Sequence, residues 1–430
     1  MTRTRVDRGA SVALVVAGAL VVGVALSSGA VVRDTLVSQN SQGVPANDYS
    51  STEIGGALSS DGRLVAFSSR AVNLPGGSGT FFQTYVRDTE TGRTTLMSRK
   101  RNGGPAEGAA VTGGISADGR FVAFEGAGTG LPGSNPNAAE VWVRDRRKGE
   151  TRLVSKTNDG KPARGDDSVE PTLSADGRYV VFSSLATNLP GGPGGVFVRD
   201  LERGHTVRAS RTSSGDSAYG FLCGQSISSD GSWVVFRSDD PGLPGANGDN
   251  HIYLRDLDRG RTTLVDRTTD GQVGKGGDAD CPSISGNGRF VAFKSYATNL
   301  PGVTAPDSQQ FLRDTKRGRL ILVSRNNPGD PQDGSALYGQ PSGDGRYVTF
   351  QARATNLPGS DPSFDQAYVR DLKRGRTRLL SRAANGDPGD ARSDTISISR
   401  NGHWAAFESA ATNLGGDAGH DNVFRAGRIP

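Results

Sequence analysis

Apolar and polar positions alternate with a period of two along most of this chain, and the pattern recurs in near copies. One copy, residues 174–192, reads SADGRYVVFSSLATNLPGG. Tyr179 and Val181 face one side of an extended segment, while Val180 and Phe182 face the other. A strand that is apolar on both sides must be covered on both sides. The Asp-Gly pair between two apolar segments is a strong hairpin signal, so each copy predicts a β-hairpin with a fully covered second strand.

Seven copies align on the Asp or Asn that precedes the turn glycine, which we call the marker residue. The markers are Asp61, Asp118, Asp176, Asp230, Asn287, Asp344 and Asn401, spaced 54 to 58 residues apart. Every copy places Phe six residues after its marker (Phe67, Phe124, Phe182, Phe236, Phe293, Phe350 and Phe407). We assign these rings to packing between sheets rather than to a ligand, because large apolar side chains at regular positions are mostly core.

Four strands per copy and no helical period predict an all-β protein, a seven-bladed β-propeller of four-stranded blades. Six copies continue with a Val-Arg-Asp-like third strand, a turn glycine and a fourth strand, whereas the seventh ends after its third strand. The segment TLVSQNSQG from Thr35 matches the fourth-strand segment TLMSRKRNG from Thr95. We therefore expect an N-terminal strand to complete the last blade and close the ring.

The motif SxDGRxVAF, followed by VRD and a turn, resembles the repeats of TolB-like β-propellers, which are related in architecture to WD-repeat propellers. The resemblance covers the chain from Thr35 to Pro430 and implies the propeller fold. It departs from TolB in blade number, in the ATNLPG element, and in having no counterpart of the N-terminal α/β domain. The resemblance therefore implies a fold and no particular activity.

The N-terminus has a different character. Arg3, Arg5 and Arg8 precede an uncharged stretch from Gly9 to Val32, which is typical of a secretory signal over residues 1–30. The alternative is that this stretch is retained as a membrane anchor. In both cases we expect residues 31–430, a single propeller, to be secreted or otherwise extracytoplasmic.

Charge divides the predicted propeller into two faces. The turns between third and fourth strands, on what we call the basic face, contain thirteen Arg or Lys and four acidic residues, although the whole chain is only +5. The basic residues are Arg93, Arg146, Arg147, Lys148, Arg203, Arg259, Arg261, Lys316, Arg317, Arg319, Lys373, Arg374 and Arg376. We expect this face to contact an anionic membrane or wall polymer. Nucleic acid is not expected, because the protein is exported and its basic residues lack interleaved aromatics.

The opposite face has loops of variable length and an acidic balance, and we call it the variable face. Loops on a rigid scaffold usually carry binding residues, so a protein or cell-envelope ligand is expected there, bound by a monomer. The ligand-binding candidates are the carboxylates Glu53, Glu170, Asp280 and Asp394, six to eight residues before their markers, with Tyr49, Tyr219 and Tyr338 from the same loops. The alternative is that these carboxylates cap turns and bond loop backbone.

Cys223 and Cys281 are the only cysteines and occupy nearly the same register in neighbouring copies. Export permits oxidation, so a disulfide between two first strands is predicted, with two buried thiols as the alternative. The four histidines fall in different registers, so no transition-metal centre and no cofactor is expected. Calcium in the acidic loops stays open, although no EF-hand spacing occurs.

These observations favour a non-catalytic exported β-propeller that acts as a binding or protein-interaction scaffold through its acidic variable face. The alternative is a carbohydrate-active enzyme, a lyase or hydrolase, with two carboxylates on that face about 5–9.5 Å apart. No G-x-S-x-G nucleophile elbow occurs in the sequence.

Overall fold

A computed structural model describes residues 35–52, 56–303, 306–427 and 429, and within these all side chains except those of 221–223. The expected signal or anchor over residues 1–30 lies outside the described residues. Among those described, none belongs to a helix with the length and apolar character needed to cross a membrane.

The chain from Val32 onward forms one unit of seven four-stranded antiparallel sheets, which confirms the seven-bladed β-propeller. The first four blades comprise β2 (Ser50–Ser51), β3 (Leu64–Ser69), β4 (Gln83–Asp88) and β5 (Arg93–Leu96); β6 (Ala110–Ile115), β7 (Phe121–Gly126), β8 (Glu140–Asp145) and β9 (Glu150–Leu153); β10 (Ser168–Leu173), β11 (Tyr179–Ser184), β12 (Gly195–Asp200) and β13 (His205–Arg208); and β14 (Phe221–Ile227), β15 (Trp233–Ser238), β16 (His251–Asp256) and β17 (Arg261–Leu264).

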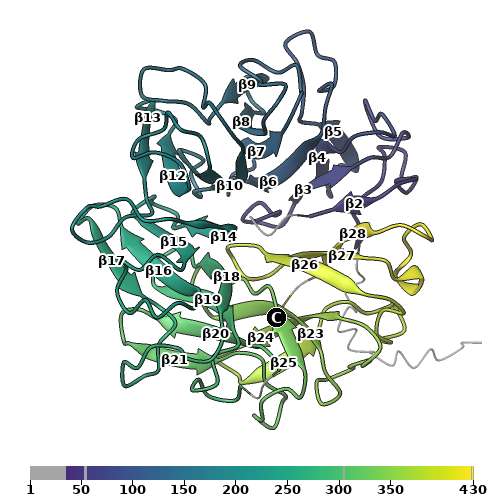
Figure 1. The fold of residues 1–430 in the computed structure, drawn as a ribbon. Helices are drawn as coiled ribbons and strands as arrows, with labels where there is room; N and C mark the ends of the chain where they lie inside the picture. The colour runs from purple at the N-terminus through teal and green to yellow at the C-terminus, as the bar shows by residue number, and fades with distance from the viewer. Residues whose placement is uncertain (1–34, 53–55, 304–305, 428, 430) are drawn as a thin grey trace, which may run out of the picture. The chain divides into compact units, whose positions relative to one another are not determined.

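The fifth and sixth blades comprise β18 (Ala279–Ile284), β19 (Phe290–Ser295), β20 (Gln309–Asp314) and β21 (Arg319–Leu322); and β22 (Ser335–Leu337), β23 (Tyr347–Arg353), β24 (Gln366–Asp371) and β25 (Arg376–Leu379). The seventh blade contains β26 (Ser393–Ile398), β27 (Ala405–Ser409), β28 (Asn422–Ala426) and, as its outer strand, β1 (Thr35–Leu36), with the short 3₁₀ helix η1 (Thr412–Leu414) between β27 and β28. The first strands of neighbouring blades contact one another, as β6 contacts β10 and β14 contacts β18, so they surround a common centre (Figure 1).

The expected closure of the ring is confirmed. Strand β1 pairs antiparallel with β28, with Thr35 opposite Arg425 and Leu36 opposite Phe424. The next residue, Val37, is fully buried, and its N–H donates to the carbonyl oxygen of Val423 at 2.7 Å. The two ends of the propeller chain are therefore held together in one sheet.

Side chains of the marker turn itself form the hydrogen bonds that stabilise it. In the third blade Ser174 Oγ donates to Asp176 Oδ1 at 2.6 Å, and the same carboxylate accepts the N–H of Arg178. Gly177 has φ 71°, and a Cβ atom there would lie 2.3 Å from the ring of Phe121 in the preceding blade. Glycine is thus required twice, by the left-handed turn and by the close packing of neighbouring blades.

Stacked aromatic pairs form the core of every blade. The phenylalanine six residues after each marker is fully buried and stacks on an aromatic ring of the third strand, as Phe67 stacks on Tyr85 at 5.5 Å and Phe182 on Phe197 at 5.8 Å. The predicted packing role of these phenylalanines is confirmed. Such rings contribute about 0.5–1.5 kcal/mol per pair beyond their buried area.

The repeated ATNLPG element is a clasp between blades. Its leucine is buried, as at Leu189, and its asparagine bonds the loop that follows the preceding fourth strand. Asn188 Nδ2 donates to the carbonyl oxygen of Pro162 at 3.0 Å, and Asn299 Nδ2 does the same to Val273 at 2.8 Å. Five blades form this bond, whereas the second and fourth blades have Gly130 and Gly242 in place of the asparagine.

Candidate functional site

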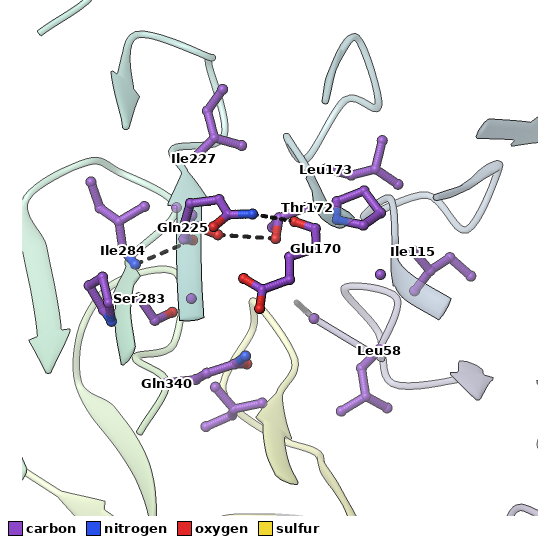
Figure 2. Close-up of a pocket in the computed structure, with 18 of the residues that line it drawn as sticks. Leu58, Ile115, Glu170, Thr172, Leu173, Gln225, Ile227, Ser283, Ile284 and Gln340 are labelled. Carbon is purple, nitrogen blue, oxygen red and sulfur yellow. Dashed lines mark hydrogen bonds between the residues drawn. The ribbon is translucent and has the colours of Figure 1, made fainter. Parts of the chain in front are cut away.

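A cavity of about 370 Å³ lies at the centre of the ring and is lined by residues of all seven blades. Figure 2 shows its lining, with the Glu170 side chain directed into the open space. Cavities of this size accept small ligands in other proteins. The cavity is therefore the candidate functional site.

The first strands of the blades line the cavity, and most of them contain a β-bulge. β6, β10, β14, β18 and β26 each shift register against their partner strand. The position six residues before the marker is left-handed in five blades, with φ 53° at Glu170, 81° at Gly224, 49° at Cys281, 36° at Tyr338 and 42° at Thr395. Each non-glycine residue there costs on the order of 1–3 kcal/mol, so its neighbours must impose the conformation.

The bulge at Glu170 is clamped by two neighbouring blades. Its N–H donates to the Glu125 carboxylate from the second blade. Its carbonyl oxygen accepts a bond from Gln225 Nε2 of the fourth blade at 2.6 Å, which Figure 2 shows as a dashed line. Burial raises the pKa of Glu125 to about 7, and the bond from Glu170 opposes that rise. A carboxyl group that changes charge near neutral pH thus stands beside the Glu170 side chain.

Below the bulges the wall is apolar. The residue three positions before every marker lines the cavity, and in each blade that residue is hydrophobic. We call these residues the apolar girdle: Leu58, Ile115, Leu173, Ile227, Ile284, Pro341 and Ile398. Several of them surround the opening in Figure 2. A ligand that enters past Glu170 therefore meets a hydrophobic ring.

Arg400 crosses the channel beneath the girdle. It comes from the seventh blade, and its Nη1 donates to Ser229 Oγ of the fourth blade at 2.7 Å. Gly286 and Gly343 leave room for it, since a Cβ at Gly286 would lie 3.0 Å from Arg400 Nη1. Burial lowers the pKa of the Arg400 guanidinium. The cavity is thus acidic at the bulges, apolar in the middle and cationic at the turn end.

Two sequence candidates line this cavity. Glu170 and Tyr338 both occupy left-handed bulge positions on first-strand segments that face the channel. Glu170 is half-buried, and Figure 2 shows its side chain directed into the cavity. Both residues lie six positions before their markers, and this distance is what identified them as candidates in the sequence.

Asp280 and Asp394 lie beside the channel but are not among its lining residues. Asp280 forms ion pairs with Arg237 at 2.7 Å and Lys294 at 3.4 Å. Asp394 accepts a bond from Gln351 Nε2 at 2.5 Å and pairs with Arg392, while burial raises its pKa. Both carboxylates connect neighbouring blades through side-chain contacts, with Arg237 for Asp280 and Gln351 for Asp394.

Tyr49 and Tyr219 are exposed and also lie outside the cavity lining. Tyr49 stands edge-on to His420 with ring centroids 5.2 Å apart, and Arg70 lies over its ring at 5.0 Å. The backbone N–H of Tyr219 donates to Asp240 Oδ2 at 2.8 Å. Glu53 lies outside the described residues.

The predicted disulfide concerns two adjoining first strands. Cys281 is buried in β18 at a left-handed bulge position, and β14, which contains Cys223, contacts β18. The Cys223 side chain lies outside the described residues, so the bridge stays a prediction. We expect intact protein to resist thiol alkylation until it is unfolded and reduced, which mass spectrometry would measure; alkylation on unfolding alone would contradict the bridge.

Sequence reasoning missed four kinds of lining residue: the apolar girdle, Glu125, the two glutamines Gln225 and Gln340, and Arg400. The girdle had a signal, because the position three before each marker is hydrophobic in all seven copies. Glu125 lies seven residues after its marker, where the other copies have Ser68, Ser183, Arg237, Lys294, Gln351 and Glu408. The residue type at this position differs between copies although the rest of the strand is similar between them. This difference is the feature of the sequence that could have identified Glu125 as a candidate.

Among the described residues, no three His, Cys, Asp or Glu side chains gather in a group that could hold a metal ion. Calcium at the acidic loops stays a prediction.

No protein-family model and no curated protein sequence matches the chain. Solved structures do resemble it. Oligogalacturonate lyase from Vibrio parahaemolyticus is 14% identical, with a TM-score of 0.55 over 90% of this chain and 92% of that chain. The β-propeller domain of the Trilobed protease from Pyrococcus furiosus is 14% identical, with a TM-score of 0.52 over 89% and 94%.

TolB from Acinetobacter baumannii is also among the similar structures, at 13% identity and a TM-score of 0.43 over 86% of this chain and 81% of that chain. The propeller fold that the resemblance to TolB-like repeats implied is confirmed by the seven four-stranded sheets and by the similarity to the Trilobed protease propeller. At such identities a likeness of structure says nothing about activity, since one fold hosts many functions.

Proposed function

We propose that this protein is a non-catalytic binding module whose central cavity takes the end of a ligand that combines an apolar part with a cationic group. The cavity lining supports this proposal. Glu125 and Glu170 stand at one end and the apolar girdle lies beyond them. A cation beside the two glutamates would keep Glu125 ionised near neutral pH, against the burial that raises its pKa to about 7.

The single observation that supports the proposal most strongly is the apolar girdle. Seven hydrophobic side chains, one per blade, line a cavity of about 370 Å³. Burying apolar surface contributes roughly 25 cal/mol per Å², so an apolar ligand part would gain affinity there. The carboxylates would then set which apolar ligand is preferred.

Three short probes of one length test the charge preference: n-hexylamine, 1-hexanol and hexanoate. We expect the amine to raise the melting temperature most and hexanoate least, measured by scanning calorimetry over a range of probe concentrations. A probe at about 100 times its dissociation constant stabilises the fold by roughly 2.7 kcal/mol. Equal shifts from the amine and the alcohol would refute the cation preference.

The variant Glu170→Gln is expected to remove the preference for the amine over the alcohol while leaving binding of the alcohol unchanged. The matched control is Asp166→Asn, which removes one charge from an exposed carboxylate in the loop that enters the same strand. That control should keep the preference. A loss of preference in both variants would assign it to the charge of the variable face and not to the cavity.

The catalytic alternative, a carbohydrate-active lyase or hydrolase, rests on the same two glutamates. Glu125 and Glu170 come from adjacent blades, and the raised pKa of Glu125 suits a general acid near neutral pH. Oligogalacturonate lyase is among the structures with this fold. Turnover of oligogalacturonates or other acidic oligosaccharides that is abolished by Glu125→Gln would replace the binding proposal with this one.

The expected location remains part of the proposal. Three arginines followed by the uncharged stretch from Gly9 to Val32 support export. An exported propeller would present its cavity to partners in the cell envelope or medium. Fractionation of cells that express the full chain would test this, with recovery in the cytoplasm as the contradicting result.

A further inference from the structure

A second cavity opens between the fourth and fifth blades, away from the central channel. It has a volume of about 590 Å³ and is lined by residues of β15–β17, the marker turn of the fifth blade, β20 and the turn between β20 and β21. Figure 1 labels these strands in two neighbouring blades. We call it the basic groove. The turns that form it belong to the basic face.

The basic groove is strongly cationic. Its lining contains six basic side chains and one carboxylate, Asp256. The basic ones are Arg259, Arg261, Arg267, Arg289, Arg313 and Lys316. Arg259 pairs with Asp256 at 3.0 Å, and Arg289 pairs with Asp314 at 2.5 Å. Within the described part of the chain, no ion pair involves Arg261, Arg267 or Lys316.

The basic groove lies beside the fifth blade, which lacks a hydrogen bond that five other blades share. In five other blades the buried arginine of the third strand donates to a threonine of the fourth strand, as Arg255 does to Thr262 at 3.0 Å and Arg370 to Thr377 at 2.8 Å. The fifth blade has Leu320 at that place. Its arginine, Arg313, has no threonine acceptor and, among the described residues, donates only to the carbonyl oxygens of Val265 at 3.0 Å, Gly318 at 2.8 Å and Arg267. The arginines of other blades add such carbonyl bonds to their threonine bond, as Arg255 donates to the Thr212 carbonyl at 2.9 Å.

Arg313 is therefore a buried cation without a carboxylate in contact. It is 3% exposed, and burial together with the nearby Arg267 lowers its pKa to about 10. An uncompensated buried charge is costly, and a bound anion would relieve part of that cost. Of the other groove cations, Arg259, Arg261, Arg267 and Lys316 are exposed and can reach an anion from the rim, whereas Arg289 is half-buried.

We propose that the basic groove binds a linear phosphodiester polymer, one of whose phosphates occupies the groove. Phosphate is the anion that fits a cluster of guanidinium groups best, because their fixed fork of donors matches its oxygens. A polymer fits better than a lone phosphate, since exposed cations continue along the same face at Arg317, Arg319 and Lys373. A flat membrane would meet these rim cations and not the recess.

The test measures binding of the full-length protein to poly(glycerol phosphate) by calorimetry at low and physiological salt. The variant Arg261→Gln/Lys316→Gln removes two exposed cations of the groove. We expect it to bind about tenfold more weakly, which corresponds to about 1.4 kcal/mol. Binding by the unchanged protein should also weaken with salt, because exposed charges are screened beyond about 8 Å at physiological ionic strength.

The matched control is Arg93→Gln/Lys148→Gln, which removes two exposed cations from the corresponding turns of the first and second blades, away from the groove and from the cations that continue beside it. This control changes the net charge by the same amount and should weaken binding less than about twofold, because the affected charges lie outside the groove. Both variants should melt at the temperature of the unchanged protein, since none of the four side chains is buried.

Three results would overturn the proposal. Equal weakening in both variants would assign binding to the whole basic face. A groove-dependent complex with phosphatidylglycerol vesicles, or with a single-stranded oligonucleotide, that is tighter than the polymer complex would assign the groove to a membrane or to nucleic acid. Absence of polymer binding at low salt would show that the basic groove is not a binding site for this polymer.

Discussion

The variant Val37→Asp is expected to lower the free energy of unfolding by more than about 4 kcal/mol, because it places an unpaired carboxylate in a closed core. Val37 is fully buried in the cluster that contains Val65, Ala406 and Val423. It follows the strand that completes the seventh blade, and its N–H bonds the Val423 carbonyl at 2.7 Å. The substitution therefore removes the closure of the ring along with the apolar contact.

Equilibrium unfolding in urea, monitored by tryptophan fluorescence, measures this effect. The matched control is Val44→Asp, seven residues further on, where the side chain is 50% exposed. We expect the control to change stability by less than about 0.5 kcal/mol, as surface substitutions usually do. If Val37→Asp unfolds like the control, the N-terminal strand does not hold the propeller closed.

The variant Glu140→Gln is expected to stabilise the protein by about 3 kcal/mol at pH 8 and to have little effect near pH 4.5. Glu140 begins the third strand of the second blade, where three other blades have Gln83, Gln309 and Gln366. It is 1% exposed and accepts a bond from Ser155 Oγ, and burial raises its pKa to about 7. Glutamine keeps the acceptor and removes the charge.

The sign follows from the raised pKa. The unfolded glutamate ionises near 4.5 and the folded one near 7. Stability is therefore fully present below pH 4.5 and is lost as pH rises through 7. Glu125 and Glu408 have the same raised pKa, about 7, for the same reason, so the unchanged protein should also lose stability across this window.

Melting temperatures recorded from pH 4.5 to 8 measure the effect, and the chain offers a reciprocal control. Gln366 accepts a bond from Ser381 Oγ at 2.6 Å and donates from Nε2 to the Gly389 carbonyl at 2.8 Å. The variant Gln366→Glu should create a new pH-dependent loss of stability in the sixth blade. If neither variant changes the pH dependence, Glu140 is not a source of it.

Most of the fold is encoded locally and can be predicted from the chain. The period of two, the Asp-Gly or Asn-Gly turns and the fixed distance to the phenylalanines specify each hairpin through contacts within one copy, as at Asp176 and Phe182. The match between the segments that begin at Thr35 and Thr95 predicts the closing strand, which pairs with β28. Such features need no knowledge of distant contacts.

Only some residues of the candidate site could be predicted from the sequence. Distance to the marker identifies Glu170 and Tyr338, because it fixes which part of the first strand reaches the channel. It does not separate them from Asp280, whose ion pairs with Arg237 and Lys294 depend on side chains of other strands. The pairing of Glu170 with Glu125 likewise joins residues 45 positions apart.

The sequence by itself determined the strand pattern, the number of blades and the closure, because these depend on short-range periodicity, turn chemistry and the likeness between copies. Only the tertiary structure decided the backbone conformation at the bulges, since Glu170, Tyr338 and Thr395 have no intrinsic preference for a left-handed φ and their neighbours impose it. The tertiary structure also decided the consequence of Leu320. The missing threonine is visible in the sequence, but the carbonyl partners of Arg313 and the basic groove follow from how two blades pack together.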